Sequence, residues 1–425
     1  MDSEQKNSRR EMLKASAALA AGGITMGGVG KAQAQHDGHA ATPGSENAYP
    51  MIHGSKEQIE YGHRSKYVTS VRVQHPIGGR PSPDVFGKVF HVATPLQDSV
   101  GVITPSSLHY IATTRGSFLP DVDPKLHTLT IHGEVDRPLT LTMDDLRRFP
   151  SVTRLHFIEC AGNRHNGKQR NVQDTHGMTS CSEWTGVLLS TLLKECGLKS
   201  SAKWFVAEGA EEVKGASSIP IAKGMDDCII AYGQNGEPLR PQQGFPVRIM
   251  VPGFEGIYHT KFLRRIKITK EFYMNYNEFG HLRPEDKELA LGEQIGPKSV
   301  ITFPSGTQRL PGPGFYEISG LAWSGGGAIR RVEVSTDDGK HWVDAQFKGT
   351  PQRMAHTRFG CPWNWDGKET VLLSRCTDEI GQVQPTRAQV AKFFNVAEGE
   401  VPGLDNTIQP WRIASDGSVT NGHAT

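Results

Sequence analysis

The sequence predicts an α+β protein in which a mixed domain of strands and short helices precedes an all-β domain. The chain has 425 residues, of which 36% are hydrophobic, with 47 Lys and Arg against 45 Asp and Glu. This balance is typical of a globular protein of roughly two or three domains. The 47 Gly and 26 Pro indicate many turns, which favours strands over a helical bundle. The near-neutral charge argues against nucleic acid as the main partner.

The N-terminal residues have the pattern of an export signal. Arg9 and Arg10 precede a weakly apolar Ala/Gly run, and Ala32-Gln33-Ala34 forms a small-x-small cleavage pattern. We interpret residues 1–34 as a twin-arginine signal peptide, followed by an N-terminal extension over 35–90. The run is rich in Gly and poor in Leu and Ile, so it is a poor membrane anchor. The twin-arginine route exports folded proteins, so a periplasmic protein with a cofactor already inserted is expected, without a membrane span.

The cysteines show no haem or metal pair pattern. The chain contains Cys160, Cys181, Cys196, Cys228, Cys361 and Cys376, and no two of them form a C-x-x-C or C-x-x-C-H motif. We therefore expect no haem on this chain. Cys181, Cys196 and Cys228 occur in apolar contexts and are predicted to be buried. Whether Cys361 and Cys376 are bonded stays open, because sequence does not give the distance between them.

The mixed domain begins with a predicted strand at 127–135, in which apolar and polar residues alternate. Thr142-Met143-Asp144-Asp145 is a capping pattern for a short helix that ends before Pro150. A strand at 154–160 then leads into a turn. A helix is predicted from Thr185 to Glu195, because apolar residues recur at helical spacing and Gly197 follows.

Further strands follow before the pattern of the chain changes to all-β. Strands are predicted at 204–208 and at 246–252, and the second reads as buried on both faces. The stretch 271–300 has little apolar periodicity and is interpreted as a connection between domains. Beyond it, alternating strands and a tight turn at Asp338-Gly339 predict a β-sandwich of roughly a hundred residues.

The stretch FIECAGNRHNGK, residues 157–168, delivers one cysteine into a basic turn. A thiolate is a good ligand for a soft or high-valent metal, and cations and backbone N–H groups stabilise it. Arg164, His165, Lys168 and Arg170 supply such cations within ten residues of Cys160. On these residues alone two interpretations stay open: a metal-binding or catalytic thiolate, and a buried structural cysteine beside a solvated basic loop.

The motif ECAGNR at Glu159–Arg164 resembles the signature of the sulfite oxidase family of molybdenum enzymes. Later blocks resemble the same family in the same order: EWTGVLLSTLL (183–193), ASSIPIAKGMDDCIIAYGQNGEPL (216–239), GFPVRIMVPG (244–253), TKFLRRI (260–266) and GLAWSGGG (320–327). The resemblance covers about residues 92–385. Within the family, SSLHYIATTRGSFLPDVDP (106–124) is most similar to the molybdenum subunit of sulfane dehydrogenases of the thiosulfate-oxidising Sox system.

The resemblance implies a fold, a reaction and partners. Residues 91–275 would form a mixed α/β molybdopterin domain of the sulfite oxidase type, and 276–425 an immunoglobulin-like β-sandwich dimerisation domain with a C-terminal tail. The expected reaction is oxygen-atom transfer to protein-bound sulfane sulfur, with water as the oxygen source. The implied partners are a sulfur-carrier protein, a c-type cytochrome as electron acceptor, and a second copy of the chain in a homodimer within a hetero-oligomer.

Residue by residue, the resemblance assigns Cys160 as the protein ligand of molybdenum in its molybdopterin cofactor. Arg is suited to phosphate because its guanidinium offers a bidentate fork. The positions that resemble pterin and phosphate contacts are Asn163, Arg164, Ser218, Lys223, Arg248 and Lys261. Trp184 resembles the tryptophan that shapes the substrate pocket, with an ordinary core tryptophan as the alternative interpretation.

The chain departs from the family pattern in several places. Arg115 is taken as the arginine that faces the substrate anion, although it lies one residue closer to Pro120 than the family spacing. Gln242-Gln243 stands where animal sulfite oxidases have a histidine, so that cofactor contact is expected to be altered or lost. Tyr273 and Tyr276 are both candidates for the catalytic-site tyrosine. The alternatives in function are a sulfite dehydrogenase acting on free sulfite and a cofactor-free periplasmic binding protein.

Overall fold

The computed structural model describes residues 62, 64–65, 67–74, 91–112, 120–163, 169–211, 216–273, 294–398 and 405–423. The chain divides into residues 1–66 and 67–425, and the description below concerns the second unit. The predicted signal peptide lies outside the described residues. Within these ranges, no helix combines the length and the apolar character needed to cross a membrane.

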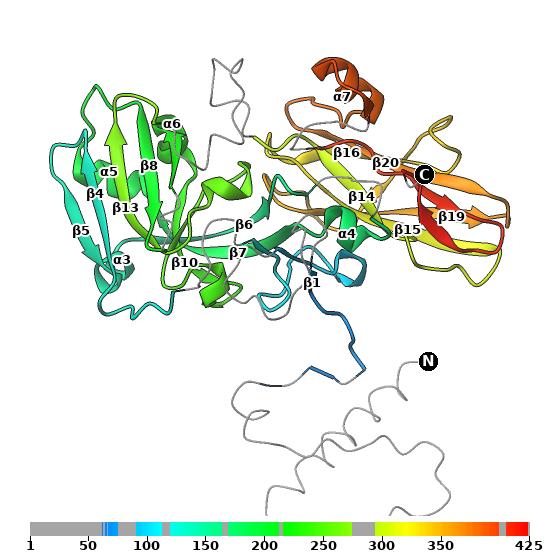
Figure 1. The fold of residues 1–425 in the computed structure, drawn as a ribbon, viewed down its shortest axis with the longest axis horizontal. Coiled ribbons are helices and arrows are strands. Elements are labelled where there is room, and N and C mark those ends of the chain that lie inside the picture. Colours follow the sequence, from blue (N-terminus) through cyan, green and yellow to red (C-terminus); the bar gives the residue numbers. More distant parts are fainter. Residues whose placement is uncertain are drawn as a thin grey trace, which may run out of the picture. The chain divides into compact units, whose positions relative to one another are not determined.

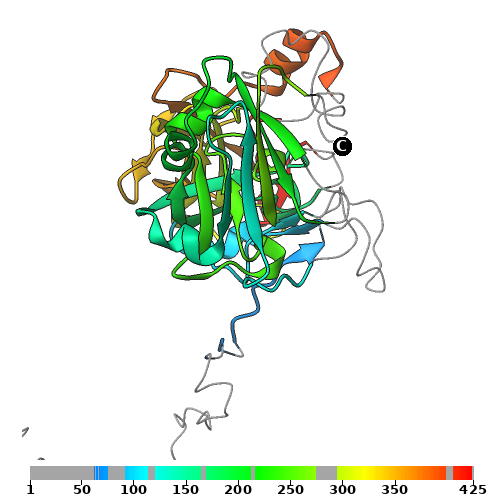
Figure 2. The ribbon, with the colours of Figure 1, turned by 90° about the vertical axis from the view of Figure 1, so that its left-hand side faces the viewer.

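The mixed domain contains two five-stranded sheets and a small three-stranded sheet. The first sheet has the strand order β5 (Leu139–Thr142), β4 (Thr128–Gly133), β13 (Leu263–Thr269), β8 (Trp204–Gly209) and β9 (Ala216–Pro220). The second has β11 (Glu237–Pro238), β10 (Ile229–Gln234), β7 (Thr179–Leu188) and β6 (Ser151–Glu159), with β12 (Arg248–Met250) also paired to β10. The small sheet is β1 (Val73–Gln74), β2 (His91–Ala93) and β3 (Ile111–Ala112). Figure 2 shows the strands of the first sheet side by side.

Short helices connect these strands. They are η2 (Leu96–Asp98), α3 (Met143–Arg148), α4 (Val172–His176), α5 (Leu189–Cys196), α6 (Ile221–Asp226), η3 (Pro241–Gln243) and η4 (Gly256–Tyr258). The predicted capping pattern is confirmed, because the Thr142 hydroxyl accepts from the Asp145 amide while the Asp145 carboxylate accepts from the Thr142 amide. Gly197 ends α5 with a φ of 70°, as the sequence indicated.

The predicted helix at 185–195 begins four residues too early. Residues 185–188 belong to β7, which pairs with β6 on one side and β10 on the other. The helix starts at Leu189. The apolar side chains Val187 and Leu188 fit a helical spacing, but strand pairing on both sides satisfies their backbone groups and overrides it. Trp184 is therefore a strand residue and not the start of a helix.

The C-terminal domain is an immunoglobulin-like β-sandwich, as the resemblance implied. One sheet has the order β14 (Lys298–Phe303), β15 (Gly314–Trp323), β19 (Thr357–Trp365) and β18 (Gln346–Phe347). The other has β17 (Val343–Asp344), β16 (Ile329–Ser335), β20 (Thr370–Asp378), β21 (Trp411–Ile413) and β22 (Val419–Asn421). The helix α7 (Arg387–Phe394) follows β20. Asp338 and Gly339 have φ angles of 61° and 80° between β16 and β17, in agreement with the predicted turn.

Strands β6 and β7 contribute to both domains. Figure 1 shows them between the sheet that carries β4 and β13 and the sandwich that carries β14 and β15. Phe157 of β6 and Cys181 of β7 pack in the sandwich core, whereas Val187 of β7 packs in the core of the mixed domain. The end of β6, which precedes Cys160, is consequently fixed by contacts from both domains.

Candidate active site

Cys160 follows directly on β6 and is half-buried, whereas the other five cysteines are buried, and no two of the six form a disulfide. The turn after it is closed by backbone hydrogen bonds from the Cys160 amide to the Met178 carbonyl, at 3.0 Å, and from the Asn163 amide to the Cys160 carbonyl, at 2.9 Å. The Gly162 amide donates to Cys160 Sγ at 3.4 Å. A backbone N–H directed at the sulfur favours a thiolate, which fits a metal ligand.

Arg248 is buried next to the apolar cluster that Cys160 contacts. Its Nη1 donates to the carbonyl oxygen and Oε1 of Gln243, at 3.0 and 3.3 Å, and its Nη2 donates to the His259 carbonyl at 2.9 Å. Its guanidinium lies 5.1 Å from the ring of Trp184. Burial lowers the pKa of Arg248 to about 10, so the side chain still carries a positive charge at neutral pH.

Lys261 adds a second cation to the same region. Its Nζ donates to the carbonyl oxygens of Ala112 and Gln242, each at 3.3 Å. Burial, reinforced by the positive charge of Arg248, lowers the pKa of Lys261 to about 8. Gly244 has a φ of 99°, and a Cβ there would lie 2.8 Å from Cβ of Lys261, so glycine allows the lysine stem to pack against the turn.

Neither cation forms an ion pair with a carboxylate within the described part of the chain, although the charge of Glu211 acts on Lys261 from a distance. Their hydrogen bonds go to carbonyl and amide oxygens, and Nε of Arg248 is buried without a hydrogen-bond partner there. A buried charge is costly unless an opposite charge compensates it. The arrangement therefore fits an anionic group such as a phosphate, for which Arg and Lys are suitable donors.

Tyr110 is a further polar group of this site. Its side chain packs with Ile158, Trp184 and Met250, and Cys160 lies against the same cluster. A Cβ on Gly256 would lie 2.9 Å from the Tyr110 hydroxyl and 3.1 Å from the Glu159 carbonyl, so this hydroxyl lies close to the backbone that precedes Cys160. Burial, reinforced by the negative charge of Cys160, raises the pKa of Tyr110 well above its usual value. The phenol therefore remains a hydrogen-bond donor.

His109 lies beside Tyr110 and Trp184. Its ring makes an edge contact with Trp184 at 5.8 Å, and its Nδ1 lies 3.0 Å from the Tyr110 carbonyl. Burial lowers its pKa to about 3, although the hydrogen bond to that carbonyl opposes the shift. His109 is thus neutral, and Nδ1 carries the proton because its partner is a carbonyl oxygen.

Some residues assigned by resemblance make other contacts in the structure. Ser218 Oγ donates to the Tyr273 carbonyl at 2.7 Å, which places these two residues together at the edge strand β9. Lys223 Nζ forms an ion pair with Asp227 at 2.8 Å. The Asn163 amide group donates to Glu159 and accepts from the Met178 amide. Their roles toward a cofactor stay predictions.

Three residues assigned by resemblance lie outside the described residues, namely Arg115, Arg164 and Tyr276. Their roles also stay predictions. Of the remaining assignments, the structure brings Cys160, Trp184, Arg248 and Lys261 into one region, and the charges of both Cys160 and Arg248 act on Tyr110 there.

Several residues of this region were missed by sequence reasoning. Tyr110 and His109 belong to the block 106–124 that resembles the family, but no local pattern marks them as buried polar groups. Gln243 was expected only as an altered cofactor contact. The structure shows its Nε2 donating to the Tyr110 carbonyl at 2.9 Å while its Oε1 accepts from Arg248. Gln243 therefore connects Tyr110 and Arg248, and this role becomes visible only in the folded structure.

Comparison with protein families identifies both domains. Residues 116–277 match the oxidoreductase molybdopterin binding domain, and residues 293–397 match the Mo-co oxidoreductase dimerisation domain. The first range contains Cys160, Trp184, Arg248 and Lys261.

Comparison with individual proteins gives relatives of two kinds. The chain is 34% identical to an NADH nitrate reductase of Brassica napus, over 76% of this chain and 39% of the relative, and 35% identical to one of Hordeum vulgare, over 68% and 36%. It spans well under half the length of these relatives. Among solved structures, the sulfane dehydrogenase SoxCD from Paracoccus pantotrophus matches with a TM-score of 0.79 and 35% identity, over 87% of this chain and 95% of that chain.

Proposed function

Because the chain belongs to the sulfite oxidase family of molybdenum enzymes, we propose that it is the molybdenum subunit of a periplasmic sulfane dehydrogenase. It is a molybdenum-dependent oxidoreductase with a molybdopterin cofactor. Membership of an enzyme family with both cofactor-enzyme domains argues against a cofactor-free binding protein. The proposed substrate is sulfane sulfur attached to a carrier protein.

The choice of sulfane sulfur as substrate rests on one observation. The likeness to the sulfane dehydrogenase extends over 95% of that chain, whereas the chain spans 39% of the nitrate reductase of Brassica napus. The nitrate reductases contain further sequence that this chain does not match. A match over the whole length of a relative supports a shared activity more strongly than a match to one part of it.

The residues of the candidate site have distinct proposed roles. Cys160 would ligate molybdenum through its thiolate. Arg248 and Lys261 would hold the phosphate of the pterin, which accounts for the absence of an ion pair to either cation within the described residues. Tyr110 would donate a hydrogen bond toward the negative groups beside Cys160, and Trp184 would keep water from Arg248. When bound, the cofactor supplies two-electron oxygen-atom chemistry, which protein side chains cannot perform alone.

The overall reaction requires a cation that faces the substrate and an acceptor for the electrons. Each oxygen atom that water adds to sulfur releases two protons and two electrons. A sulfur-bound oxygen is negatively charged, so a cation facing it stabilises the developing charge. Arg115 is proposed for this role. The electrons are proposed to leave one at a time through a c-type cytochrome on another chain, because this sequence contains no C-x-x-C-H motif.

The proposed location and assembly rest on separate features. The twin-arginine pattern at Arg9-Arg10 supports export to the periplasm. The dimerisation domain at 293–397 supports a homodimer of this subunit within the larger complex.

A steady-state assay tests the proposal. The purified protein is given a c-type cytochrome as acceptor and, in parallel, a carrier protein with a persulfide on its cysteine or free sulfite as donor. We expect kcat/KM for the carrier persulfide to exceed that for sulfite by at least about tenfold, a difference of about 1.4 kcal/mol in transition-state binding. A higher value for sulfite would make the protein a sulfite dehydrogenase and refute the proposed substrate.

A further inference from the structure

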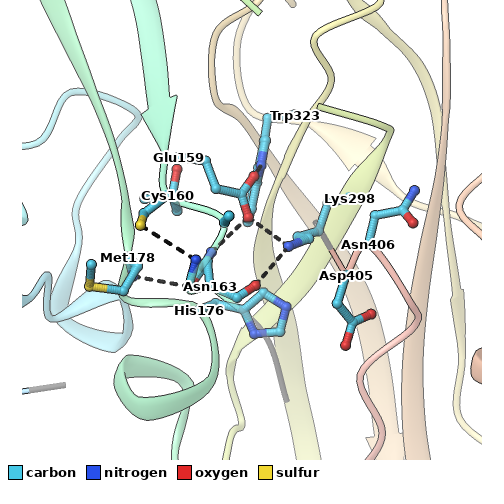
Figure 3. A network of polar contacts seen from close by, with 12 residues as sticks. Glu159, Cys160, Asn163, His176, Met178, Lys298, Trp323, Asp405 and Asn406 are labelled. Atoms are coloured by element: carbon cyan, nitrogen blue, oxygen red, sulfur yellow. Dashed lines mark hydrogen bonds and ion pairs between the residues drawn. The ribbon is translucent and has the colours of Figure 1, made fainter. Parts of the chain in front are cut away.

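Glu159, the residue immediately before Cys160, is held by side chains from both domains. Its Oε1 accepts from Asn163 Nδ2 at 2.8 Å and from Lys298 Nζ at 2.6 Å, while its Oε2 accepts from Trp323 Nε1 at 2.6 Å. Figure 3 shows Lys298 and Trp323 reaching this carboxylate from the sandwich strands. The side chains of Glu159 and Lys298 are 2% and 3% exposed, so both charges are shielded from water.

Lys298 also fixes the turn that carries Cys160. Its Nζ donates a second hydrogen bond to the Asn163 carbonyl at 3.1 Å. Asn163 in turn holds the Met178 amide through its side-chain oxygen, at 3.0 Å, and Met178 accepts from the Cys160 amide. A single ammonium group of the sandwich thus contacts both ends of the segment 159–163.

The charge of Glu159 matters because this residue directly precedes Cys160, the proposed metal ligand. A carboxylate next to a metal-bound thiolate adds negative charge beside the metal. Inside a protein such a charge acts more strongly than in water, because the surroundings screen it less. Lys298 is the cation that pairs with Glu159 in the described part of the chain, and it cancels most of that charge. Trp323 contributes a neutral N–H bond and leaves the net charge unchanged.

We propose that Lys298 makes the sandwich domain part of the metal centre, because neutralising Glu159 sets the charge beside Cys160 and thereby the reduction potential of the molybdenum. This inference rests on the proposed role of Cys160 as metal ligand, but it is independent of the sulfur substrate. Lys298 acts through Glu159 and is therefore a positioning residue.

Redox titration of the purified full-length holoenzyme, followed by electron paramagnetic resonance of Mo(V), tests the proposal without any sulfur substrate. Lys298→Gln leaves Glu159 uncompensated and should lower the potential, because negative charge favours the oxidised metal. Glu159→Gln leaves Lys298 uncompensated and should raise it. In each single variant the equilibrium constant for reduction of the metal should change about tenfold, which shifts the reduction potential by about 59 mV for a one-electron step. The double variant Glu159→Gln/Lys298→Gln should return close to the wild-type value.

Matched variants separate charge from packing. Lys298→Arg keeps the charge and should keep the potential. Lys348→Gln removes a lysine that pairs with Glu317 in the same domain, at partly exposed positions, and should change nothing. If Lys298→Gln does not fold, the comparison of Glu159→Gln with the double variant still measures the effect of removing Lys298, and this removal should lower the potential.

Three results would overturn the inference, and they are distinguishable from failure of the proposed function. With normal molybdenum content, shifts of the same sign in both single variants, or an unrestored double variant, would show that the pair acts through structure alone. Unchanged potentials in all variants would show that it does not act on the metal. Wild-type protein without molybdenum would instead refute the metal site itself, and this inference with it.

Discussion

The guanidinium of Arg248 lies 5.1 Å from the ring of Trp184, and the two side chains are 3% and 0% exposed. An aromatic face attracts a cation, but it does not replace a counter-ion. The buried arginine therefore has no counter-ion in an ion pair within the described residues, which favours the proposed anion site in this part of the mixed domain.

Replacing Arg248 should weaken cofactor binding. Arg248→Gln removes charge-assisted hydrogen bonds worth about 1.5–3 kcal/mol, so cofactor affinity should fall roughly tenfold to a hundredfold. The same change removes a buried charge, so the cofactor-free protein should not lose stability. Molybdenum per protein and the thermal unfolding midpoint are measured together. Arg264→Gln, at a partly exposed arginine paired with Glu208, is the control. Full molybdenum content in Arg248→Gln would remove Arg248 from the site.

Tyr110 should contribute to turnover and not to metal retention. Its phenol stays protonated because burial raises its pKa, so it can donate toward a negatively charged group beside Cys160. Tyr110→Phe removes one such donor, worth about 1.5–3 kcal/mol, and should lower kcat/KM roughly tenfold to a hundredfold with molybdenum content unchanged. The Tyr316 hydroxyl donates to the Gly312 carbonyl in the sandwich, and the control variant Tyr316→Phe should leave kcat/KM unchanged. Wild-type kinetics in Tyr110→Phe would refute the assignment.

Stability should fall in mild acid because of buried neutral histidines. Burial lowers the pKa of both His109 and His356 to about 3, whereas an unfolded histidine titrates near 6.5. Below that pH the unfolded chain binds more protons, so this part of the stability is complete above about pH 6.5 and is lost as pH falls toward 3. Each histidine should remove about 2 kcal/mol between pH 6.5 and 5.

A variant pair measures this effect. Urea unfolding at pH 7 and pH 5 gives the difference in unfolding free energy between the two pH values. His356→Gln should reduce that difference by about 1–2 kcal/mol relative to wild type. His341→Gln, an exposed histidine beside Asp337, should have little influence on it. An undiminished difference in His356→Gln would contradict the buried-histidine account.

The local elements of the fold could be predicted from the sequence, because residues close in the chain determine them. The capping box at Thr142 and Asp145, the glycine that ends α5 and the turn at Asp338-Gly339 all depend on neighbouring residues. The start of α5 could not be predicted, because residues 185–188 pair with strands about 36 residues before and 41 residues after them, as in the pairs Ser151↔Val187 and Ile229↔Leu188. Periodicity alone does not register such partners.

The same distinction applies to the candidate site. Cys160, Arg248 and Lys261 could be assigned because they occur in motif blocks that resemble a known family. Lys298 could not be assigned in this way, because its partner Glu159 is 139 residues away. Nothing in the sequence around Lys298 distinguishes this residue from a surface lysine. Gln243 looked like a lost contact, whereas the fold uses it to hold Arg248 and Tyr110.

Export through the twin-arginine route is testable by a conservative change. Arg9→Lys combined with Arg10→Lys preserves charge but alters the part of the signal that the receptor reads. The precursor should then remain in the cytoplasm, as detected by fractionation and immunoblotting. Lys14→Arg, a conservative change outside the arginine pair, should be exported normally. Periplasmic accumulation of the paired variant at the wild-type level would refute the interpretation of residues 1–34.

Cys160 is expected to bind molybdenum, and X-ray absorption at the molybdenum K-edge tests this binding most directly. In wild-type protein, the sulfur shell of the metal should contain the two pterin sulfurs and one thiolate. Cys160→Ser should have one sulfur ligand fewer and should lose turnover, because a hydroxyl is a poor replacement for a thiolate on this metal. A Cys160→Ser protein with an unchanged sulfur shell, or with turnover close to wild type, would contradict the account.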